Sequence, residues 1–440
     1  MEYITDYKLE NYILDTKWED FPEEVKDRAV VCAIDLMTAL IIGSKGRQHA
    51  VGLKLAKQIY KDGDVPVVGS EERLSFIGAT MAMSHASNSF DIDDGFNMVR
   101  GHPGTSFVGG VLAAAMEKNV SYREYLTTLV VTYETTIRWA LAMQNFYNFL
   151  HSTGTYGSFG TAAGVGRLFG LDKNVLNNAL SIADFHAPIV PVMRAVEYPS
   201  MNKDGVPFGT MMGAMSVLEA MDGYEGRTHF LEMPEYRYLL DSLGKEYNVM
   251  GLYFKPFTCC RWAHQPIVAS IKLMRDHKFT ARDIKSAKVH TFVAATKLSK
   301  IVPHTTDEAQ YNIAYPVAAA LVHGDLGYMQ VREEALGDGR VLDMMKRLSF
   351  VVDPAMEAEF PAKRLAWVEI ELEDGKVLRS DIFAAPGEAS DNVDYKWIIE
   401  KFMRITGPLL STERQKQILD IMSGSQDVPI RTIVDTIGKV

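Results

Sequence analysis

Apolar residues recur at helical spacing through the first half of the chain. Residues 22–42 open with a proline and two glutamates, which suit the first turn of a helix, and Gly43 supplies a stop. Ser121 and Glu124 form a capping box ahead of an apolar run that continues to Met143. The pattern predicts that this half is built of helices.

Small residues are concentrated in the same half. A buried helix is expected over 74–90, and glycine and alanine fill the segments 109–115, 154–166 and 209–214. Small residues at that density let helices pack closely, and they also let the backbone approach a ligand. The sequence leaves both explanations open.

The pattern changes near residue 280. Residues 287–295 are strand-like, and residues 366–372 alternate apolar and polar side chains ahead of Asp374 and Gly375, a strong hairpin signal. Helical spacing returns in three segments, 307–323, 339–348 and 393–423. A mixed α+β unit therefore follows the helical one.

The length of the chain agrees with two units. At 440 residues it is too long for one ordinary core. The fold class we predict is mainly α with a smaller α+β domain, which is inserted between two helical portions. We place the helical portions at 1–254 and 391–440 and the α+β domain at 255–390.

Charge and composition exclude some classes of function. Hydrophobic residues make up 47% and charged residues 23%, so neither disorder nor a fibrous repeat is indicated. The formal net charge of -10 argues against a non-specific nucleic-acid binder, which needs a basic face. An acidic protein still binds an anion where cationic side chains gather in one cleft.

Cysteine usage and the N-terminus indicate the compartment. Cys32, Cys259 and Cys260 cannot form a disulfide framework, which favours a reducing compartment. The first residues lack the apolar region of a signal peptide, and no apolar run reaches the ~18 residues that a spanning helix requires. We therefore expect a cytoplasmic protein without a membrane segment.

The densest polar cluster in apolar surroundings follows the helix expected over 74–90. It comprises Asp91, Asp93, Asp94, Arg100 and His102, with glycines and a proline that indicate a shaped loop. A metal site is poorly supported, because one histidine and scattered aspartates lack a recognised ligand spacing, and we predict none. From composition alone, an inert surface loop is an equal alternative.

Two further segments carry candidate side chains. His151 precedes a small-residue helix, an arrangement that presents a side chain and backbone N–H groups together to an anion. Ser152 is a poor nucleophile candidate, because no Gly-x-Ser-x-Gly elbow surrounds it. Lys203 lies in the loop Met-Asn-Lys-Asp-Gly. A structural histidine and a solvated lysine are the alternatives.

The stretch from Lys255 to Pro266 lies where the two patterns meet, and domain junctions are common places for pockets. Arg261 and His264 are three residues apart and offer a carboxylate-binding group and a proton carrier on one helical face. The adjacent cysteines lack the spacing of a redox or zinc motif, so we assign them mainly to packing.

Taken in order, these segments resemble the MmgE/PrpD family, which includes 2-methylcitrate dehydratase, cis-aconitate decarboxylase and iminodisuccinate epimerase. The resemblance spans nearly the whole chain. Its carriers are Asp91-Ile-Asp-Asp followed by Gly-His102-Pro-Gly, His151-Ser-Thr-Gly-Thr-Tyr-Gly-Ser-Phe-Gly, Met-Asn-Lys203-Asp-Gly, Lys-Pro-Phe-Thr-Cys-Cys-Arg-Trp-Ala-His264 and Ala-Gln-Tyr-Asn-Ile-Ala-Tyr315.

The resemblance implies a large all-helical domain made of both chain ends, an inserted α+β lid domain, and a homodimer without metal or organic cofactor. It also implies a pocket between the domains. The family's proposed active-site positions are occupied here by Asp91, His102, His151, Lys203, His264 and Tyr315. The sequence departs from the family pattern at Gly95, which precedes a longer segment to Arg100, and at Asn88, where relatives often carry histidine.

These residues suggest removal of a proton next to a carboxylate, which requires cations where negative charge develops. As a hypothesis, Lys203 and Arg261 bind the carboxylates of a small polycarboxylic acid, and His102 and His151 are candidate bases. Asp91 orients a histidine or raises its basicity, and His264 or Tyr315 supplies a proton. Arg100 and Asp94 are further substrate-binding candidates.

The same residues serve three reactions. Loss of a β-hydroxyl gives a 2-methylcitrate dehydratase-like hydro-lyase, which we favour because it is the commonest assignment in the family. Reprotonation on the other face gives an epimerase of a substituted succinate such as iminodisuccinate, and loss of carbon dioxide gives a cis-aconitate-type decarboxylase. A binding protein without catalysis is the alternative from a different class.

Overall fold

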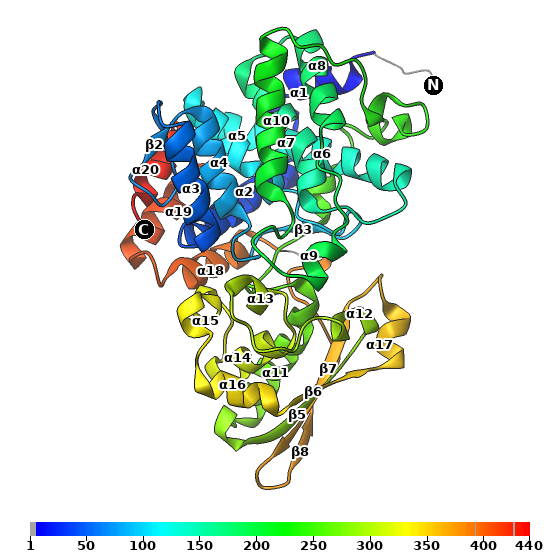
Figure 1. Ribbon diagram of the computed structural model, residues 1–440, viewed down its shortest axis with the longest axis vertical. Helices are drawn as coiled ribbons and strands as arrows, with labels where there is room; N and C mark the ends of the chain where they lie inside the picture. The colour runs from blue at the N-terminus through cyan, green and yellow to red at the C-terminus, as the bar shows by residue number, and fades with distance from the viewer. Residues whose placement is uncertain (1–5, 392, 426) are drawn as a thin grey trace.

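The computed structural model describes residues 6–391, 393–425 and 427–440. Helices from both ends of the chain form the upper part of Figure 1, and a small sheet with its helices forms the lower part. The predicted fold class, mainly α with a smaller α+β part, is confirmed.

The larger part, called the helical part below, has one hydrophobic core. Its buried residues run from Leu9 to Phe254 and resume from Val393 to Ile437. Its helices are α1 Lys8–Asp15, α2 Glu23–Gly43, α3 Arg47–Ile59, α4 Phe76–Ser87, α5 Thr105–Glu117, α6 Tyr122–Phe146, α7 Thr153–Phe169, α8 Lys173–Phe185, α9 Met193–Glu197, α10 Val206–Met221, α18 Tyr395–Thr406, α19 Thr412–Met422 and α20 Ile430–Ile437. Its short strands are β1 Val65–Pro66, β2 Arg73–Leu74, β3 Gly95–Phe96 and β4 Leu252–Tyr253.

The small residues of α7 and α10 serve close packing. A side chain at Gly209 would overlap the backbone of Gly154, and a side chain at Gly213 would overlap the carbonyl of Ser158. The two helices therefore touch backbone to backbone, which only glycine permits. The packing explanation of these segments is the correct one for α7 and α10.

The helix predicted from Ser121 is α6, but the capping box is only half formed. The Ser121 hydroxyl accepts a hydrogen bond from the Glu124 N–H at 3.2 Å. The Glu124 carboxylate binds Arg167 at 2.9 Å instead of returning to the Ser121 backbone. A long-range ion pair has replaced the local contact.

The smaller part, called the α+β part below, has a second core that packs one face of a sheet against helices. The sheet runs in the order β6-β5-β7-β8, with β9 paired to β7. Its strands are β5 Ile284–Thr291, β6 Leu348–Val352, β7 Leu365–Leu372, β8 Val377–Arg379 and β9 Phe383–Ala384. Its helices are α11 His264–His277, α12 Val293–Thr296, α13 Thr306–Gln310, α14 Ala314–His323, α15 Tyr328–Val331, α16 Gly339–Lys346 and α17 Pro354–Glu359.

Several predicted boundaries in this part were wrong. The strand expected over 287–295 starts and ends earlier, because β5 pairs with β7 from Ile284 to Thr291 and the chain then turns into α12. The helix expected over 307–323 is two helices, α13 and α14. Pro316 lacks a backbone N–H and disfavours helical backbone before it, so it is tolerated only in a first turn, here that of α14.

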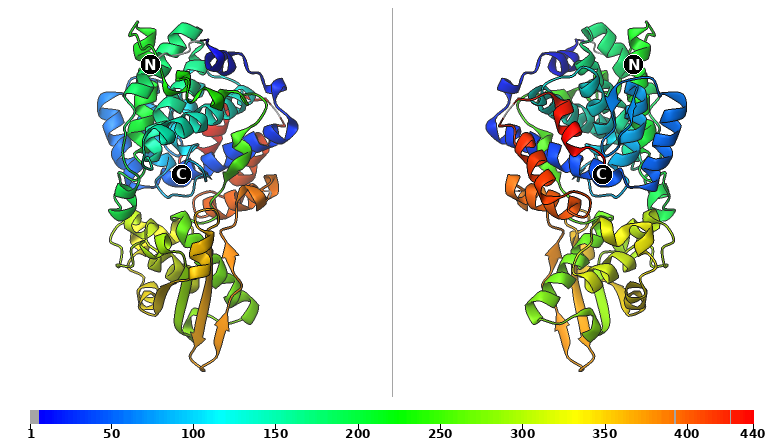
Figure 2. Two further views of the ribbon diagram at one scale, coloured as in Figure 1. Left: turned by 90° about the vertical axis from the view of Figure 1, so that its right-hand side faces the viewer. Right: turned by 90° about the vertical axis from the view of Figure 1, so that its left-hand side faces the viewer.

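Similarly, the helix expected over 393–423 divides into α18 and α19, and Gly407 and Pro408 lie between them. The two views of Figure 2 show α18 and α19 beside the N-terminal helices rather than beside the sheet. Among the described residues no single helix is long and apolar enough to cross a membrane, and α2 with α3, bent by 83°, meets that test only as a pair.

Candidate active site

The two parts meet around the turn that follows α4. Asp91 in this turn has a positive φ of 51° and is buried. Its Oδ1 accepts a hydrogen bond from Lys255 Nζ at 2.6 Å, and Lys255 also donates to the Asp91 carbonyl at 3.1 Å. Strands β3 and β4 explain this pairing, because Gly95 lies opposite Tyr253, two residues before Lys255.

His102 lies against the same carboxylates. Its Nδ1 is 3.0 Å from Asp93 Oδ2, and its Nε2 is 3.7 Å from Asp91 Oδ1. Burial and the Lys255 charge oppose a proton on the ring, but Asp93 and Asp91 outweigh them and raise the His102 pKa to about 9. Burial also opposes charge on Asp93, yet His102 and Lys255 lower the Asp93 pKa to about 2. His102 is therefore an imidazolium at neutral pH.

Asp94 points the other way, into the helical part. It accepts hydrogen bonds from the Tyr133 hydroxyl and, at 3.0 Å, from the Gly104 N–H. Burial and the nearby Asp35 raise the Asp94 pKa to about 7. These contacts give Asp94 a role in holding the 91–104 loop.

Asp204 joins the cluster, although the sequence did not single it out. One ligand atom each from Asp91, His102 and Asp204 lies within 4.8 Å of the others. The Tyr311 hydroxyl donates to Asp204 Oδ2 at 3.0 Å, and burial raises the Asp204 pKa. The available signal was position: Asp204 follows Lys203 directly, and Lys255 and Tyr311 lie inside two quoted motifs.

The imidazole of His102 and the carboxylates of Asp91 and Asp204 are ligands that a divalent cation can bind. Here the positive charge already comes from side chains. Lys255 and protonated His102 balance Asp91 and Asp93 at separations of 2.6 and 3.0 Å. Burial raises the pKa of Asp204 and so favours its neutral form. The group thus fits a balanced set of buried acids and bases better than a metal centre.

Lys203 links the two parts of the molecule. Its Nζ donates to the carbonyls of Asn88 at 2.8 Å and Ser89 at 2.6 Å, and to Gln310 Oε1 at 2.7 Å. Asp307 of α13 lies 3.5 Å away. All three ammonium protons are therefore used in this conformation, and a substrate carboxylate must replace one of these acceptors to bind Lys203.

His151 is buried without a hydrogen bond to either ring nitrogen from the described residues. It stacks on Phe149 at a ring distance of 4.1 Å. Burial lowers the His151 pKa to about 4, so the ring is neutral at pH 7. Two residues further on, the Thr153 hydroxyl accepts a hydrogen bond from the His102 N–H at 3.3 Å, which joins the two histidine segments.

Arg261 and Arg100 do not enter this cluster. Arg261 donates to the Pro386 carbonyl at 2.7 Å and to Glu388 Oε1 at 2.9 Å, and it stacks over Tyr253. Its guanidinium thus binds residues 386–388, which follow the last strand of the α+β part. The Arg100 side chain is exposed to solvent.

His264 and Tyr315 make their polar contacts within the α+β part. His264 Nε2 is 3.0 Å from the Cys259 carbonyl, and burial keeps the His264 pKa well below its usual value. The Tyr315 hydroxyl donates to the Gln330 carbonyl at 2.7 Å. In the same motif, Tyr311 rather than Tyr315 reaches the Asp91 and His102 cluster, through Asp204.

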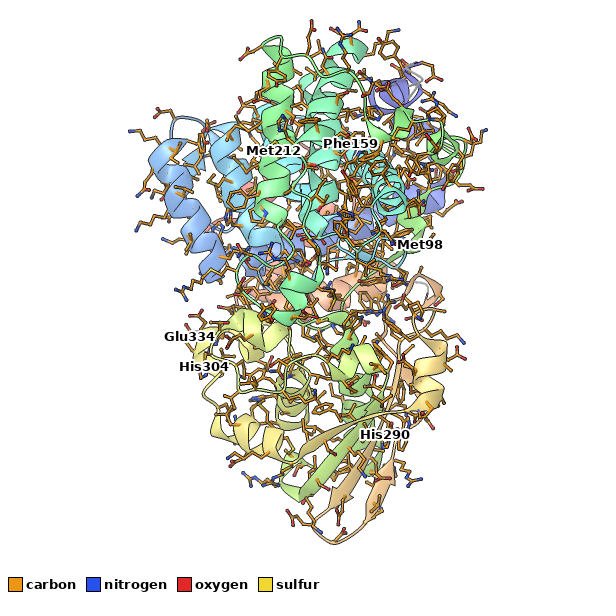
Figure 3. All side chains as sticks on the ribbon, turned by 45° about the vertical axis from the view of Figure 1, so that its right-hand side comes forward. Met98, Phe159, Met212, His290, His304 and Glu334 are labelled. Atoms are coloured by element: carbon orange, nitrogen blue, oxygen red, sulfur yellow. The ribbon has the colours of Figure 1, made fainter. Side chains whose placement is uncertain are left out.

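A pocket of about 1060 Å³ opens beside the cluster. Its walls come from α3, the α9 region and the start of α10 on one side, and from residues 299–308 on the other. Lys203 and Ser152 lie in its wall, together with His85, Arg194 and His304, the last labelled in Figure 3. The pocket therefore opens at Ser152 and Lys203, which are sequence neighbours of His151 and Asp204, respectively.

Comparison with known proteins adds to this geometry. Residues 7–248 match the MmgE/PrpD N-terminal domain, and residues 257–427 match the MmgE/PrpD C-terminal domain. A cis-aconitate decarboxylase-like protein of Aspergillus oryzae is 25% identical over 93% of this chain and 92% of its own length. Cis-aconitate decarboxylase of Aspergillus terreus is 21% identical over 92% and 89%, respectively. 2-Methylcitrate dehydratase of Salmonella typhi is 23% identical over 95% and 92%.

Proposed function

This chain belongs to the MmgE/PrpD family, and on that premise we propose that it is a lyase that acts on a small di- or tricarboxylic acid. The family resemblance expected from the five motifs is thereby confirmed. The reaction we propose is a 2-methylcitrate dehydratase-like loss of water from a β-hydroxy acid, without a metal or organic cofactor in the chemical step.

The proposal rests on two histidines in hydrogen-bonded segments whose surroundings favour opposite protonation states. His151 is neutral with both nitrogens unpaired among the described residues, and His102 carries a proton. Elimination of water needs one group of each kind. In our proposal His151 removes the proton next to a carboxylate, the carbon–oxygen bond to the hydroxyl breaks, and His102 protonates the leaving hydroxide. An alkene and one water result.

Cations support the developing negative charge. Lys255 binds the Asp91 carboxylate directly, and Lys203, the residue before Asp204, lies in the wall of the pocket. We propose that a substrate carboxylate enters through the pocket and takes the place of Gln310 or a carbonyl on Lys203. In this scheme Asp91 and Asp93 hold His102 in place. Asp204, which accepts a hydrogen bond from Tyr311, lies beside Asp91 and His102. His264 and Tyr315 act as supports of the α+β part in this scheme.

Decarboxylation is the second candidate, because two of the relatives named above are cis-aconitate decarboxylase or decarboxylase-like proteins. That reaction needs an acid to protonate the carbanion and no base, so His151 would be dispensable. Epimerisation of a substituted succinate needs proton transfer on both faces and is the third outcome of the experiment below.

We also propose that the protein is a cytoplasmic homodimer, as the family resemblance implies. Large apolar side chains remain exposed on the single chain, including Phe208 at 72% and Ile301 at 77%. Exposed apolar residues that gather near a pocket suit a partner surface. Light scattering on the purified protein measures the oligomeric state.

The test is incubation in deuterated water with citrate, 2-methylcitrate, cis-aconitate and hydroxy- or amino-substituted succinates, followed by NMR. New alkene carbon signals without bicarbonate support dehydration; with 2-methylcitrate they should come with a methyl singlet in place of the doublet, because the alkene formed carries no hydrogen. These signals should vanish in His151→Ala. Bicarbonate indicates decarboxylation, and deuterium entry without net change indicates epimerisation. No change with any compound would leave the family assignment and remove the proposed activity. Turnover that survives a chelator supports chemistry by side chains alone.

A further inference from the structure

A second set of converging polar side chains lies inside the helical part and shares no residue with the cluster around His102. It comprises Glu10 of α1 and His229 and Glu232 of the turn after α10. One ligand atom of each lies within 4.8 Å of the others, and each residue is only 2% exposed. Residues more than 200 positions apart thus bring an imidazole and two carboxylates together in a buried place.

The surroundings hold these groups in place. Asn177 of α8 donates its amide hydrogens to Glu10 Oε1 at 3.0 Å and to Glu232 Oε1 at 3.1 Å. The ring of Phe159, labelled in Figure 3, packs edge-on against His229 at 5.2 Å. An amide that orients two carboxylates, beside an aromatic wall, resembles the outer shell of an ion site.

The charges of this set do not balance. Two carboxylates face one imidazole, and even a protonated His229 leaves one negative charge. Glu232 Oε2 is buried and has no hydrogen-bond partner among the described residues. A third carboxyl, that of Asp184, accepts a hydrogen bond at 3.4 Å from the backbone N–H of Phe230, the residue after His229. Buried charge without compensation is costly, so the set calls for a further cation.

We propose that Glu10, His229 and Glu232 bind one divalent transition-metal ion, and that Zn²⁺ fits best. Glu10 Oε1 and His229 Nε2 are 3.4 Å apart. This is long for an N–H···O hydrogen bond, but two ligands about 2.0–2.1 Å from a tetrahedral zinc lie about 3.4 Å apart. Two carboxylates, a neutral imidazole and Zn²⁺ sum to zero charge. The unpaired Oε2 of Glu232 is the atom that we propose as the ligand from that residue, and a water molecule would supply the fourth ligand.

The ion has a structural role in this arrangement. It joins α1 to the turn at 229–232, while Asn177 connects both to α8. An ion that binds the folded chain and not the unfolded one raises stability by mass action. The inference goes beyond the proposed lyase activity, which uses none of these residues.

The experiment uses the full-length protein, treated with a chelator, dialysed, and loaded with Zn²⁺. Elemental analysis after removal of excess ion should give one zinc per chain, and Tm should rise on loading. Glu232→Gln keeps the size and the Asn177 contact but removes the charge, so it should lose the zinc and the Tm increase. Glu235→Gln, at an exposed glutamate three residues away, is the matched control and should keep both.

Two further variants make the result unambiguous. Glu10→Gln provides an independent loss of charge if Glu232→Gln fails to fold, as judged by circular dichroism. Asp204→Asn removes a donor from the other candidate group, next to His102, and should leave the zinc content unchanged. Wild-type protein that retains no zinc, or zinc that is lost in Asp204→Asn but kept in both glutamate variants, would overturn the proposal.

Discussion

At the scale of single residues, the site depends on how neighbouring charges set the proton on each histidine. His102 has two carboxylates within 4 Å, and His151 has aromatic neighbours and no hydrogen-bond partner among the described residues. Two imidazoles of equal intrinsic pKa therefore differ by several pKa units, about 9 against about 4. In the proposed reaction this difference separates the acid from the base.

The pH dependence of kcat/KM follows from these values. Activity should rise as pH increases through about 4, where His151 loses its proton, and fall as pH increases through about 9, where His102 loses its proton. A pH profile of wild type and His102→Gln measures both limits. The variant should lose roughly 10²–10⁴-fold in rate and show no alkaline limb assigned to His102. An unchanged alkaline limb in the variant would remove His102 as the acid.

Lys203 is expected to affect folding as well as turnover. In Lys203→Met, Asp307, whose side chain is 6% exposed, loses the ammonium beside it, and three acceptors each lose one donor. Breaking a buried pair in this way costs about 3–5 kcal/mol. Urea unfolding should show this loss, whereas Lys297→Met, at an exposed lysine, should unfold like wild type. Equal stability of the two variants would mean that the Lys203 contacts contribute little.

At the scale of elements, the short pair β3 and β4 holds the active-site loop next to Lys255. Gly95 lies opposite Tyr253, and a methyl group at Gly95 would overlap the Tyr253 ring. The same ring stacks under Arg261. The departure from the family pattern at Gly95 therefore has a physical reason in the close approach of this ring.

Gly95→Ala tests the importance of that approach. The added methyl group should displace Tyr253 and cost about 1–3 kcal/mol of stability, together with a loss of kcat/KM through the moved loop. Gly337→Ala is the matched control, because a Cβ there meets no atom within 4 Å. Thermal unfolding compares the two variants. Adding Tyr253→Ala to Gly95→Ala should recover part of the loss, and no recovery would place the strain elsewhere.

Element boundaries show the limit of local patterns. The alternation over 366–372 correctly predicted β7, and the turn at Asp374 and Gly375 lies between β7 and β8 as expected. The predicted end of β5 was wrong, because the length of that strand depends on its pairing with β6 and β7. Pairing across the sheet is not visible in the residues of one strand.

At the scale of the whole molecule, the C-terminal helices complete the core that the N-terminal helices begin. Lys401 of α18 forms a buried ion pair with Asp35 of α2 and donates to the Ile92 carbonyl at 2.7 Å. The C-terminal segment is thus hydrogen-bonded to the turn that contains Asp91. The domain boundaries at 254 and 390 remain predictions.

Truncation after Gly407 tests this dependence. The deletion removes α19 and α20, which bury Ile418, Ile430 and Ile437 completely, and exposes the opposing core. We expect aggregation or loss of the cooperative unfolding transition, measured by size-exclusion chromatography and circular dichroism. Co-expression of residues 408–440 as a separate chain is the control and should restore soluble protein. A truncated chain with the wild-type Tm would contradict the prediction.

The helical first half, the alternating strands, and the ordered motifs that hold His102, His151 and Lys203 could all be predicted from the order of residues along the chain. These features are local: periodicity and motif order depend on residues close together in the chain. The folded chain was needed to see that Asp204 and Lys255 join His102, that Tyr311 rather than Tyr315 reaches this group, and that the surroundings of the two histidines favour opposite protonation states. These contacts and protonation states depend on burial and on distances between segments far apart in sequence, and a local sequence pattern contains no information about either.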